Sequence, residues 1–410
     1  MIEKELNMSE REFTASEALA KIIDAIGSLG LNYTLSPSNT SDLIATATLI
    51  DESGKTLSEG AGKGLSCSVG ALAECIEHLY ATSDIAQQTK LIKSRKIALQ
   101  KFTIVDEVIA NLPDKDISLP CLPFFEISEG SEVQVPAALI STNRKVLETT
   151  MNCPDTNFLA RYSTNSGTAF GCSFNEAILH GLNEVVERHI LSCLFMSACK
   201  QSLRQHTYTP SPALMSLVRL ELCDASIDTS WMNILLIESA TGVFFSAALP
   251  KEEESQFILC PIGSGCSISP VTAVTRSITE LMQITALYDE SEHGLDSITY
   301  DLLNSHPLLR NLIQLSEFRT EAFPAWNKSI SRQTLSIEKQ INLVVKGLRR
   351  TGHNTSYRIL KTFDNGCIVT QVYIPGMDRF NLIRAGSAVA PQHILRCSRT
   401  HFFHDMTSSI

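Results

Sequence analysis

Residues 175–188 show helical periodicity that separates an apolar face from an acidic one. At about 100° per residue, the apolar arc holds Ile178, Leu179, Leu182, Val185 and Val186. The opposite arc holds Glu176, His180, Glu184 and Glu187. Like charges at i,i+3 destabilise an isolated helix by about 0.2–0.5 kcal/mol, and no lysine shares this face. Taken alone, the pattern is most simply a solvated face, so its significance depends on whether it recurs.

The same division into two faces recurs in two other stretches. In residues 70–80, the polar face holds Glu74, Glu77 and His78. In residues 270–288, it holds Thr272, Arg276, Thr279, Glu280 and Gln283. Glutamate pairs at i,i+3 spacing suit Mg²⁺, which prefers oxygen ligands and whose charge relieves carboxylate repulsion. An arginine, a glutamate and a glutamine suit the phosphates and polar edges of a nucleotide. A site between helices for Mg²⁺ and a nucleotide is one interpretation, and three solvated faces are the other.

The remaining signals alternate between helix and strand without a strict βαβ rhythm. Further helices are predicted at 16–29, 69–82, 90–111, 175–199 and 270–288, and strands at 43–50 and 367–374. Hairpins are predicted at 133–140 with 146–150 and at 234–238 with 243–249, and a long surface loop at 112–131. These elements predict an α/β fold of mixed sheets with helices packed on their faces. We divide the chain into an N-terminal α/β unit, 1–60, and a second domain, 61–410.

Composition excludes several classes of protein. A formal charge of -10 argues against a nucleic-acid partner. No signal peptide is visible and no stretch approaches the roughly 18 apolar residues of a membrane helix, so we expect no membrane partner. The twelve cysteines include no CxxC pair and are expected to be small buried hydrophobes in a reducing, cytoplasmic compartment. The oligomeric state is left open, with a homodimer among the options.

Common nucleotide motifs are absent from the sequence. The segment Gly60–Gly64 lacks the upstream glycine and the Ser/Thr of a Walker A loop, and no GxGxxG is present. Its glycines are consistent with turn chemistry, and Lys63 with a phosphate contact.

Five segments, in one order, resemble the YcaO family. They are Gly62-Lys63-Gly64, ALAECIEH at 71–78, EAILHGLNEVVER at 176–188 preceded by Gly171, RSITELMQ at 276–283, and VYIPGMD at 372–378. The likeness runs from about residue 10 to about residue 400.

The resemblance implies a YcaO-type fold that binds ATP and Mg²⁺. By position, it implies that the metal ions are held by Glu74, Glu77, Glu184 and Glu187. It implies nucleotide or phosphate contacts for Lys63, Glu176, Arg188, Arg276, Glu280 and Gln283.

Four departures from the family pattern concern this chain's site and its end. Gly70 stands where a serine is usual, Cys172 where an asparagine is common, and the loop between Gly64 and Gly70 is about three residues shorter than usual. The chain ends without a PxPxP tail. The catalytic base is therefore unknown, with the carboxylate of Ile410 and the side chains of His78 and His180 as candidates.

Family members add a nucleophile to a peptide backbone amide, whose oxygen takes the γ-phosphate of ATP and then leaves as phosphate. The resemblance therefore implies maturation of a ribosomally made peptide, such as a bacteriocin, or of a protein, by azoline cyclodehydration or thioamidation. The expected partners are a substrate peptide and a ThiF-like protein for azolines or a TfuA-like protein for thioamides. The alternatives are a non-catalytic family member and an ATP-dependent carboxylate–amine ligase.

Overall fold

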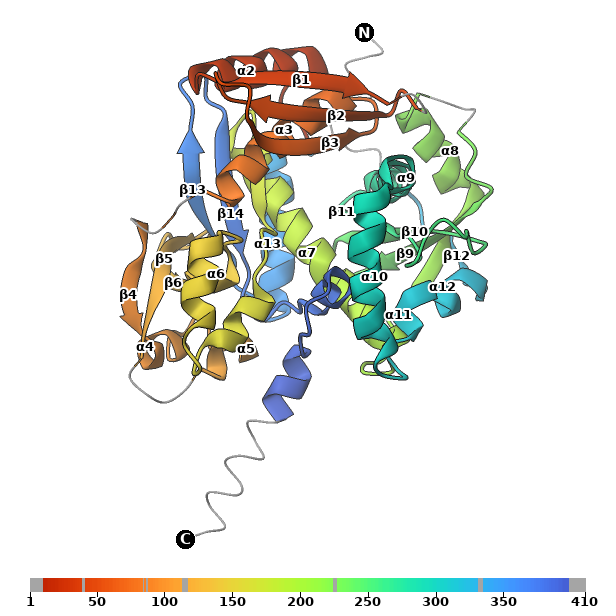
Figure 1. Ribbon diagram of the computed structural model, residues 1–410. Coiled ribbons are helices and arrows are strands. Elements are labelled where there is room, and N and C mark those ends of the chain that lie inside the picture. Colours follow the sequence, from red (N-terminus) through yellow and green to blue (C-terminus); the bar gives the residue numbers. More distant parts are fainter. Residues whose placement is uncertain are drawn as a thin grey trace.

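The computed structural model of the protein describes residues 10–38, 41–83, 85, 88–112, 117–223, 227–330 and 335–397. Three separate sheets surround one long helix, α7 (Phe174–Ala198), as Figure 1 shows. Each sheet carries a helix of its own toward the centre of the molecule, and this arrangement places the candidate site.

The first sheet has three antiparallel strands in the order β1-β2-β3. They are β1 (Asn32–Pro37), β2 (Ile44–Ile50) and β3 (Thr56–Lys63). Helices α2 (Ala15–Ser28) and α3 (Cys67–Ala81) pack with it around an apolar core. Helix α2 begins with a capping box formed by Thr14 and Glu17.

The glycines of β3 bring this sheet close to α3. A Cβ built on Gly62 would lie 1.7 Å from the carbonyl oxygen of Cys67, and one on Gly60 would lie 2.5 Å from that of Ala71. Any larger residue would push the helix off the strand. The turn interpretation is therefore wrong for Gly60 and Gly62, which lie in β3 and allow close packing. It holds for Gly64, which follows the strand with φ +78°.

The second sheet has six strands, in the order β4-β5-β13-β14-β7, with β6 paired to β5. They are β4 (Lys90–Lys93), β5 (Ser118–Glu126), β6 (Glu132–Pro136), β7 (Thr168–Gly171), β13 (Ser356–Thr362) and β14 (Ile368–Tyr373). Helix α7 packs on β7 and β14. Its N-cap is Ser173, whose hydroxyl accepts the backbone N–H of Glu176.

The third sheet has the order β11-β10-β9-β8-β12. Its strands are β8 (Thr207–Pro210), β9 (Met232–Glu238), β10 (Phe244–Pro250), β11 (Gly263–Ser267) and β12 (Ala325–Trp326). Helix α9 (Pro270–Leu287) covers β10 and β11, with Ser269 as its N-cap and Pro270 in its first turn. On the far side of the site from α3, α8 (Pro212–Glu221) packs against α9.

The other helices complete the chain. They are α4 (Ser94–Ala98), α5 (Glu107–Ala110), α6 (Arg144–Met151), α10 (Glu290–Asn304), α11 (Asn311–Gln314), α12 (Ser316–Thr320) and α13 (Ile337–Arg350), with 3₁₀ turns η2 (Ala137–Leu139), η3 (Asn157–Tyr162) and η4 (Phe380–Ala385).

The mixed α/β architecture and most long elements are confirmed, including the hairpin of β9 and β10. Three local predictions are wrong. Residues 90–111 form β4 and two short helices, residues 118–126 of the expected loop form β5, and residues 146–150 belong to α6 instead of a hairpin strand. The boundary at residue 60 lies inside β3, and the division into domains stays a prediction. None of the helices in the described part of the chain combines the length and apolar character needed to cross a membrane.

Candidate active site

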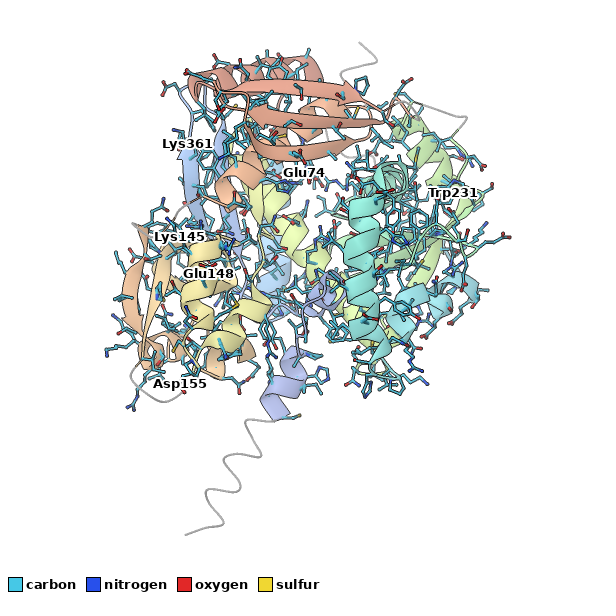
Figure 2. The ribbon with its side chains drawn as sticks, in the orientation of Figure 1. Glu74, Lys145, Glu148, Asp155, Trp231 and Lys361 are labelled. Carbon is cyan, nitrogen blue, oxygen red and sulfur yellow. The ribbon has the colours of Figure 1, made fainter. Side chains whose placement is uncertain are left out.

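Helices α3, α7 and α9 meet at the centre of the molecule, because each also contacts a strand outside its own sheet. Helix α3 contacts β7, α7 contacts β11, and α9 contacts β3. Between them lies a cavity of about 1510 Å³. Figure 2 shows Glu74 beneath the three-stranded sheet, near the middle of the molecule. The cavity wall includes nine of the sequence-predicted residues: Lys63, Glu74, Glu77, Glu184, Glu187, Arg188, Arg276, Glu280 and Gln283.

The four glutamates predicted to hold metal ions are each fixed by a hydrogen bond through one carboxylate oxygen. The donors are the backbone N–H of Ala61 to Glu74 (2.6 Å), of Phe170 to Glu77 (2.7 Å) and of Gly167 to Glu184 (3.0 Å), and the Ser264 hydroxyl to Glu187 (2.6 Å). Within the described chain, the second oxygen of each carboxylate has no hydrogen bond. Such carboxylates are held in place by neighbouring strands and keep one oxygen for a cation.

Burial makes the charged form costly for three of these carboxylates, those of Glu77, Glu184 and Glu187. It raises the pKa of Glu184 to about 7, opposed by the Arg188 guanidinium and the Gly167 N–H. Burial is also the first cause that raises the pKa of Glu77 well above its ordinary value and the pKa of Glu187 above its own. Neighbouring glutamates push in the same direction. A bound cation would remove this penalty.

Basic side chains are distributed over the same cavity. Lys63 forms an ion pair with Glu280, and Arg188 lies 3.9 Å from Glu184. Across the described cavity wall, eight glutamates face five lysines and arginines. This excess of carboxylates favours metal cations in the site.

Glu10 is a site residue that the sequence patterns did not indicate. Its carboxylate is buried and lies 2.6 Å from Nη2 of Arg276, while Arg276 Nη1 donates to the carbonyl oxygen of Cys266. The hydroxyl of Ser267 and the side-chain amide of Asn183 also donate to it. Glu10 and Arg276 are 266 positions apart in the sequence, so no local pattern could indicate their ion pair.

Glu176 lies apart from the other predicted residues and does not line the cavity. It is 3% exposed, and its carboxylate accepts the backbone N–H groups of Cys172 and Glu12. In this structure it closes the first turn of α7 and ties down the N-terminal segment. Its nucleotide contact stays a prediction.

The structure places two of the sequence departures, and for Gly70 it also gives a packing reason. Gly70 packs against β3, where an added Cβ would lie 3.3 Å from the Cα of Gly62. Cys172 is buried in the core, away from the cavity wall. The buried cysteines behave as hydrophobes, and burial raises the pKa of Cys75 and Cys121 to about 12.

The three candidates for the catalytic base lie in different surroundings. His180 lines the cavity, but burial and nearby cations lower its pKa to about 3, so it is a poor proton acceptor. His78 is held by the carbonyl oxygen of Glu59 through Nδ1. Ile410 lies outside the described residues.

The walls fit a nucleotide with its metal ions. Polar atoms of five buried or partly buried lining residues have no hydrogen-bond partner within the described chain: Gln283 Nε2, Asn183 Oδ1, Thr168 Oγ1, Thr275 Oγ1 and Trp326 Nε1. A polar ligand would supply the missing partners. In the described chain, no three of the cavity carboxylates bring ligand oxygens within 4.8 Å of one another. Mg²⁺ commonly uses one or two carboxylates plus substrate phosphates, so pairs of glutamates suffice.

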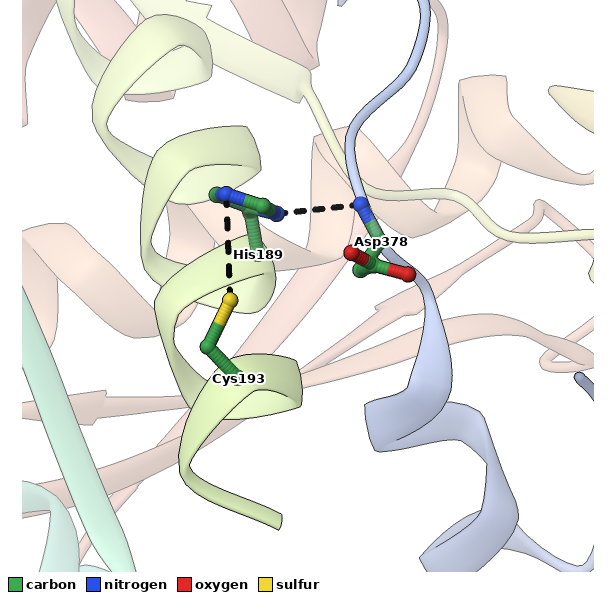
Figure 3. Close-up of side chains that lie close together, drawn as sticks. All are labelled: His189, Cys193 and Asp378. Carbon is green, nitrogen blue, oxygen red and sulfur yellow. Dashed lines mark hydrogen bonds between the residues drawn. The ribbon is translucent and has the colours of Figure 1, made fainter. Parts of the chain in front are cut away.

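A second cluster, formed by His189, Cys193 and Asp378, has ligand atoms within 4.8 Å of one another (Figure 3). The backbone N–H of Asp378 donates to Nδ1 of His189 over 3.0 Å. The ring proton therefore lies on Nε2, 3.9 Å from the Cys193 sulfur. Because Nε2 would have to lose that proton to bind a metal, the cluster is a hydrogen-bonded link between α7 and the 378 loop.

The fold itself is shared with proteins of known structure. YcaO from Methanopyrus kandleri, bound with AMPPCP and Mg²⁺, matches with a TM-score of 0.61 and 18% identity over 93% of this chain and 96% of that one. A heterocyclase in complex with substrate and cofactor matches with a TM-score of 0.60 and 18% identity over 90% of this chain, which spans 53% of that protein. These likenesses show that the chain has a YcaO-type fold.

The sequence gives the narrower assignment. Residues 61–378 match the family described as YcaO cyclodehydratase, binding ATP and Mg²⁺. The chain belongs to the YcaO family. It is also 24% identical over 345 residues to an uncharacterised protein in the tfuA 3′ region of Rhizobium leguminosarum bv. trifolii, covering 79% of this chain and 77% of that one.

Proposed function

We propose that this protein uses Mg²⁺ and ATP to activate backbone amides of a ribosomally made peptide or a protein. The observation that carries the proposal is the set of four anchored glutamates from α3 and α7 on one cavity wall, opposite the Arg276–Glu280–Gln283 face of α9. Membership of the YcaO family supports the same chemistry.

Each group of residues has a distinct role in this proposal. Glu74 and Glu77 of α3, with Glu184 and Glu187 of α7, hold Mg²⁺. Lys63, Arg188 and Arg276 neutralise the triphosphate, and Glu280 orients Lys63 through their ion pair. Gln283 offers its unpartnered amide to the nucleotide. Mg²⁺ supplies most of the charge neutralisation at the phosphates.

The reaction requires an activated oxygen, because an amide oxygen is a poor leaving group. Addition of a nucleophile to the amide carbon leaves an oxyanion, which attacks the γ-phosphate; the phosphorylated oxygen then departs as phosphate. The residues of this chain contribute orientation and charge neutralisation in a largely buried site.

Two products are compatible with this site, an azoline and a thioamide. The position of the Rhizobium relative beside tfuA favours thioamide formation with a TfuA-like partner. A ThiF-like partner would accompany azoline formation. We place the protein in the cytoplasm, supported by buried cysteines such as Cys75, Cys199 and Cys266, which are free.

The test is ATP turnover by the variant Glu187→Gln. The substitution keeps an acceptor for Ser264 and removes one metal-binding charge, so ADP release should fall at least roughly 100-fold while the thermal transition stays cooperative. Glu148→Gln, on α6 and outside the cavity (Figure 2), is the matched control. ADP release at the wild-type rate by Glu187→Gln would refute the metal assignment.

Two measurements test the alternatives: calorimetry with Mg-ATP for a non-catalytic family member, and ADP release for a carboxylate–amine ligase. A non-catalytic family member without a nucleotide site would give no binding heat. A carboxylate–amine ligase would release ADP only when a free carboxylic acid is present, whereas a peptide with blocked ends should suffice for the proposed reaction.

A further inference from the structure

The cavity continues beyond the acidic residues into a part with different chemistry. There its wall is formed mainly by α8, β10, the start of α9 and β12. Five of the apolar residues in this part are Leu217, Leu220, Phe244, Val271 and Trp326. We call these five residues the apolar subsite.

The total volume leaves room for a second occupant. Sites for one small ligand typically enclose about 300–1,000 Å³, and this cavity encloses about 1510 Å³. Helix α9 carries both chemistries: Arg276 and Glu280 form one strip, and Val271 lies about 140° from Arg276 around the helix. Both strips line the same cavity, so a ligand in the apolar subsite would share that cavity with the nucleotide.

The subsite is built around an ordered aromatic pair. The rings of Phe244 and Trp326 meet edge to face, with centroids 5.5 Å apart. Trp326 is 3% exposed, yet its indole N–H has no acceptor within the described chain. An unpaired buried donor is unfavourable. Its nitrogen has less than 1 Å² of accessible surface, so a small shift of the ring is needed before a carbonyl oxygen in the cavity can accept from it.

Charge at this end of the cavity argues against a second phosphate-bearing ligand. The nearby Lys328 is already paired with Glu238, at 2.5 Å. Glu221 of α8 also lines the cavity beside Leu220, and its carboxylate disfavours an anionic ligand as well. The apolar contacts and the indole N–H match a peptide: an aliphatic side chain beside a backbone carbonyl.

We infer that the apolar subsite binds the substrate peptide through an aliphatic side chain next to the reacting residue. The inference rests on the proposed function and adds the class of residue that flanks the modified amide. Trp326 contacts this side chain, and its N–H receives a backbone carbonyl of the peptide.

Tryptophan fluorescence tests the inference directly, because the chain has only two tryptophans. Trp231 lies outside the cavity wall, near α8 in Figure 2. The variant Trp231→Phe leaves Trp326 as the single emitter. The probes are acetyl-Gly-Leu-Cys-Gly-amide and acetyl-Gly-Asp-Cys-Gly-amide, with Mg-ATP present. The leucine peptide should change the emission saturably, with at least roughly ten-fold tighter binding than the aspartate peptide. Equal binding, or no change with either peptide, would overturn the inference.

A matched pair of surface variants supplies a second measurement. Leu220, on α8, and Leu295, on α10, are 58% and 60% exposed, so the fold should tolerate aspartate at both. Leu220→Asp should weaken binding of the leucine peptide about ten-fold, whereas Leu295→Asp should not. Equal effects of the two variants would contradict the inference.

Mg-ATP calorimetry on the same proteins distinguishes the two ways to fail. Binding of Mg-ATP without a peptide response refutes the apolar subsite alone. If the wild-type protein does not bind Mg-ATP, the proposed function is refuted.

Discussion

In the metal-free protein, the contribution of Glu184 to stability should fall as the pH rises from about 5 to about 8, whereas His180 and His189, with pKa values lowered by burial to about 3 and about 4, act in the opposite direction. The pKa of Glu184 is raised from 4.5 to about 7 by burial. The folded state therefore holds its proton over a pH range in which the unfolded state has released it. The contribution of this group to the free energy of unfolding is fully present below about pH 4.5 and is lost as the pH rises through about 7.

The magnitude follows from the shift. Each pKa unit corresponds to about 1.4 kcal/mol, so Glu184 alone accounts for about 3 kcal/mol, with its side chain 23% exposed. Unfolding entropy of about 2.1 cal/mol/K per residue converts this into roughly 3–4 °C for 410 residues. The raised pKa values of Glu77 and Glu187 act in the same direction.

The assay is thermal unfolding at pH 5 and pH 8, with and without Mg-ATP, for the wild type and Glu184→Gln. The amide resembles the protonated carboxyl. Without Mg-ATP, the variant should therefore unfold roughly 3–4 °C above the wild type at pH 8 and at the same temperature as the wild type at pH 5. Mg-ATP should stabilise the wild type more at pH 8 than at pH 5, since metal ligands must be deprotonated. The variant should gain much less.

Glu148→Gln is the control here too, because it removes an acidic group on α6 outside the cavity. It should follow the wild type at both pH values. A Glu184→Gln variant that is no more stable than the wild type at pH 8, or that exceeds it by the same amount at pH 5, would refute the assignment of a desolvated carboxylate cluster.

Two further substitutions test the packing and the N-terminal contact. Gly62→Ala should destabilise the protein by roughly 3 kcal/mol or more, measured by chemical denaturation, because its Cβ would overlap the Cys67 carbonyl. The control Gly294→Ala lies in open space on α10 and should instead stabilise the protein by about 0.5–1 kcal/mol. Equal effects of the two substitutions would contradict the packing argument. Glu10→Gln should lower the free energy of unfolding by roughly 1–3 kcal/mol. It should also tighten Mg-ATP binding severalfold in calorimetry, because Arg276 is then no longer neutralised. Weaker binding would show instead that Glu10 orients Arg276 for the nucleotide.

The long helices were predictable because each hides one continuous apolar face. Ile178, Leu182 and Val186 are buried, as the periodicity of α7 requires. Strand β5 was not predictable in the same way. Its prolines, Pro120 and Pro123, indicate a loop, and its burial changes phase between Cys121 and Leu122, so no simple alternation marks it.

Helix α6 was missed although a local signal existed. Asn143 is its N-cap, accepting the backbone N–H groups of Lys145 and Val146. Residues that cap helices also favour turns, and the two roles cannot be separated from a short polar stretch alone. The hairpin interpretation chose the wrong role for Asn143.

Glu176 shows what a helical wheel omits from a site prediction. It shares an arc with Glu184 and Glu187, but a helix rises about 1.5 Å per residue, which places Glu176 about 12 Å and about 16 Å from them along the axis. At that distance it meets the β7 end and the N-terminal segment, where backbone N–H groups satisfy its charge. Glu184 and Glu187 are three residues apart, so about 5 Å of rise keeps both on the cavity. Angular position selects the face of a helix, and axial spacing decides which residues of that face can share one ligand.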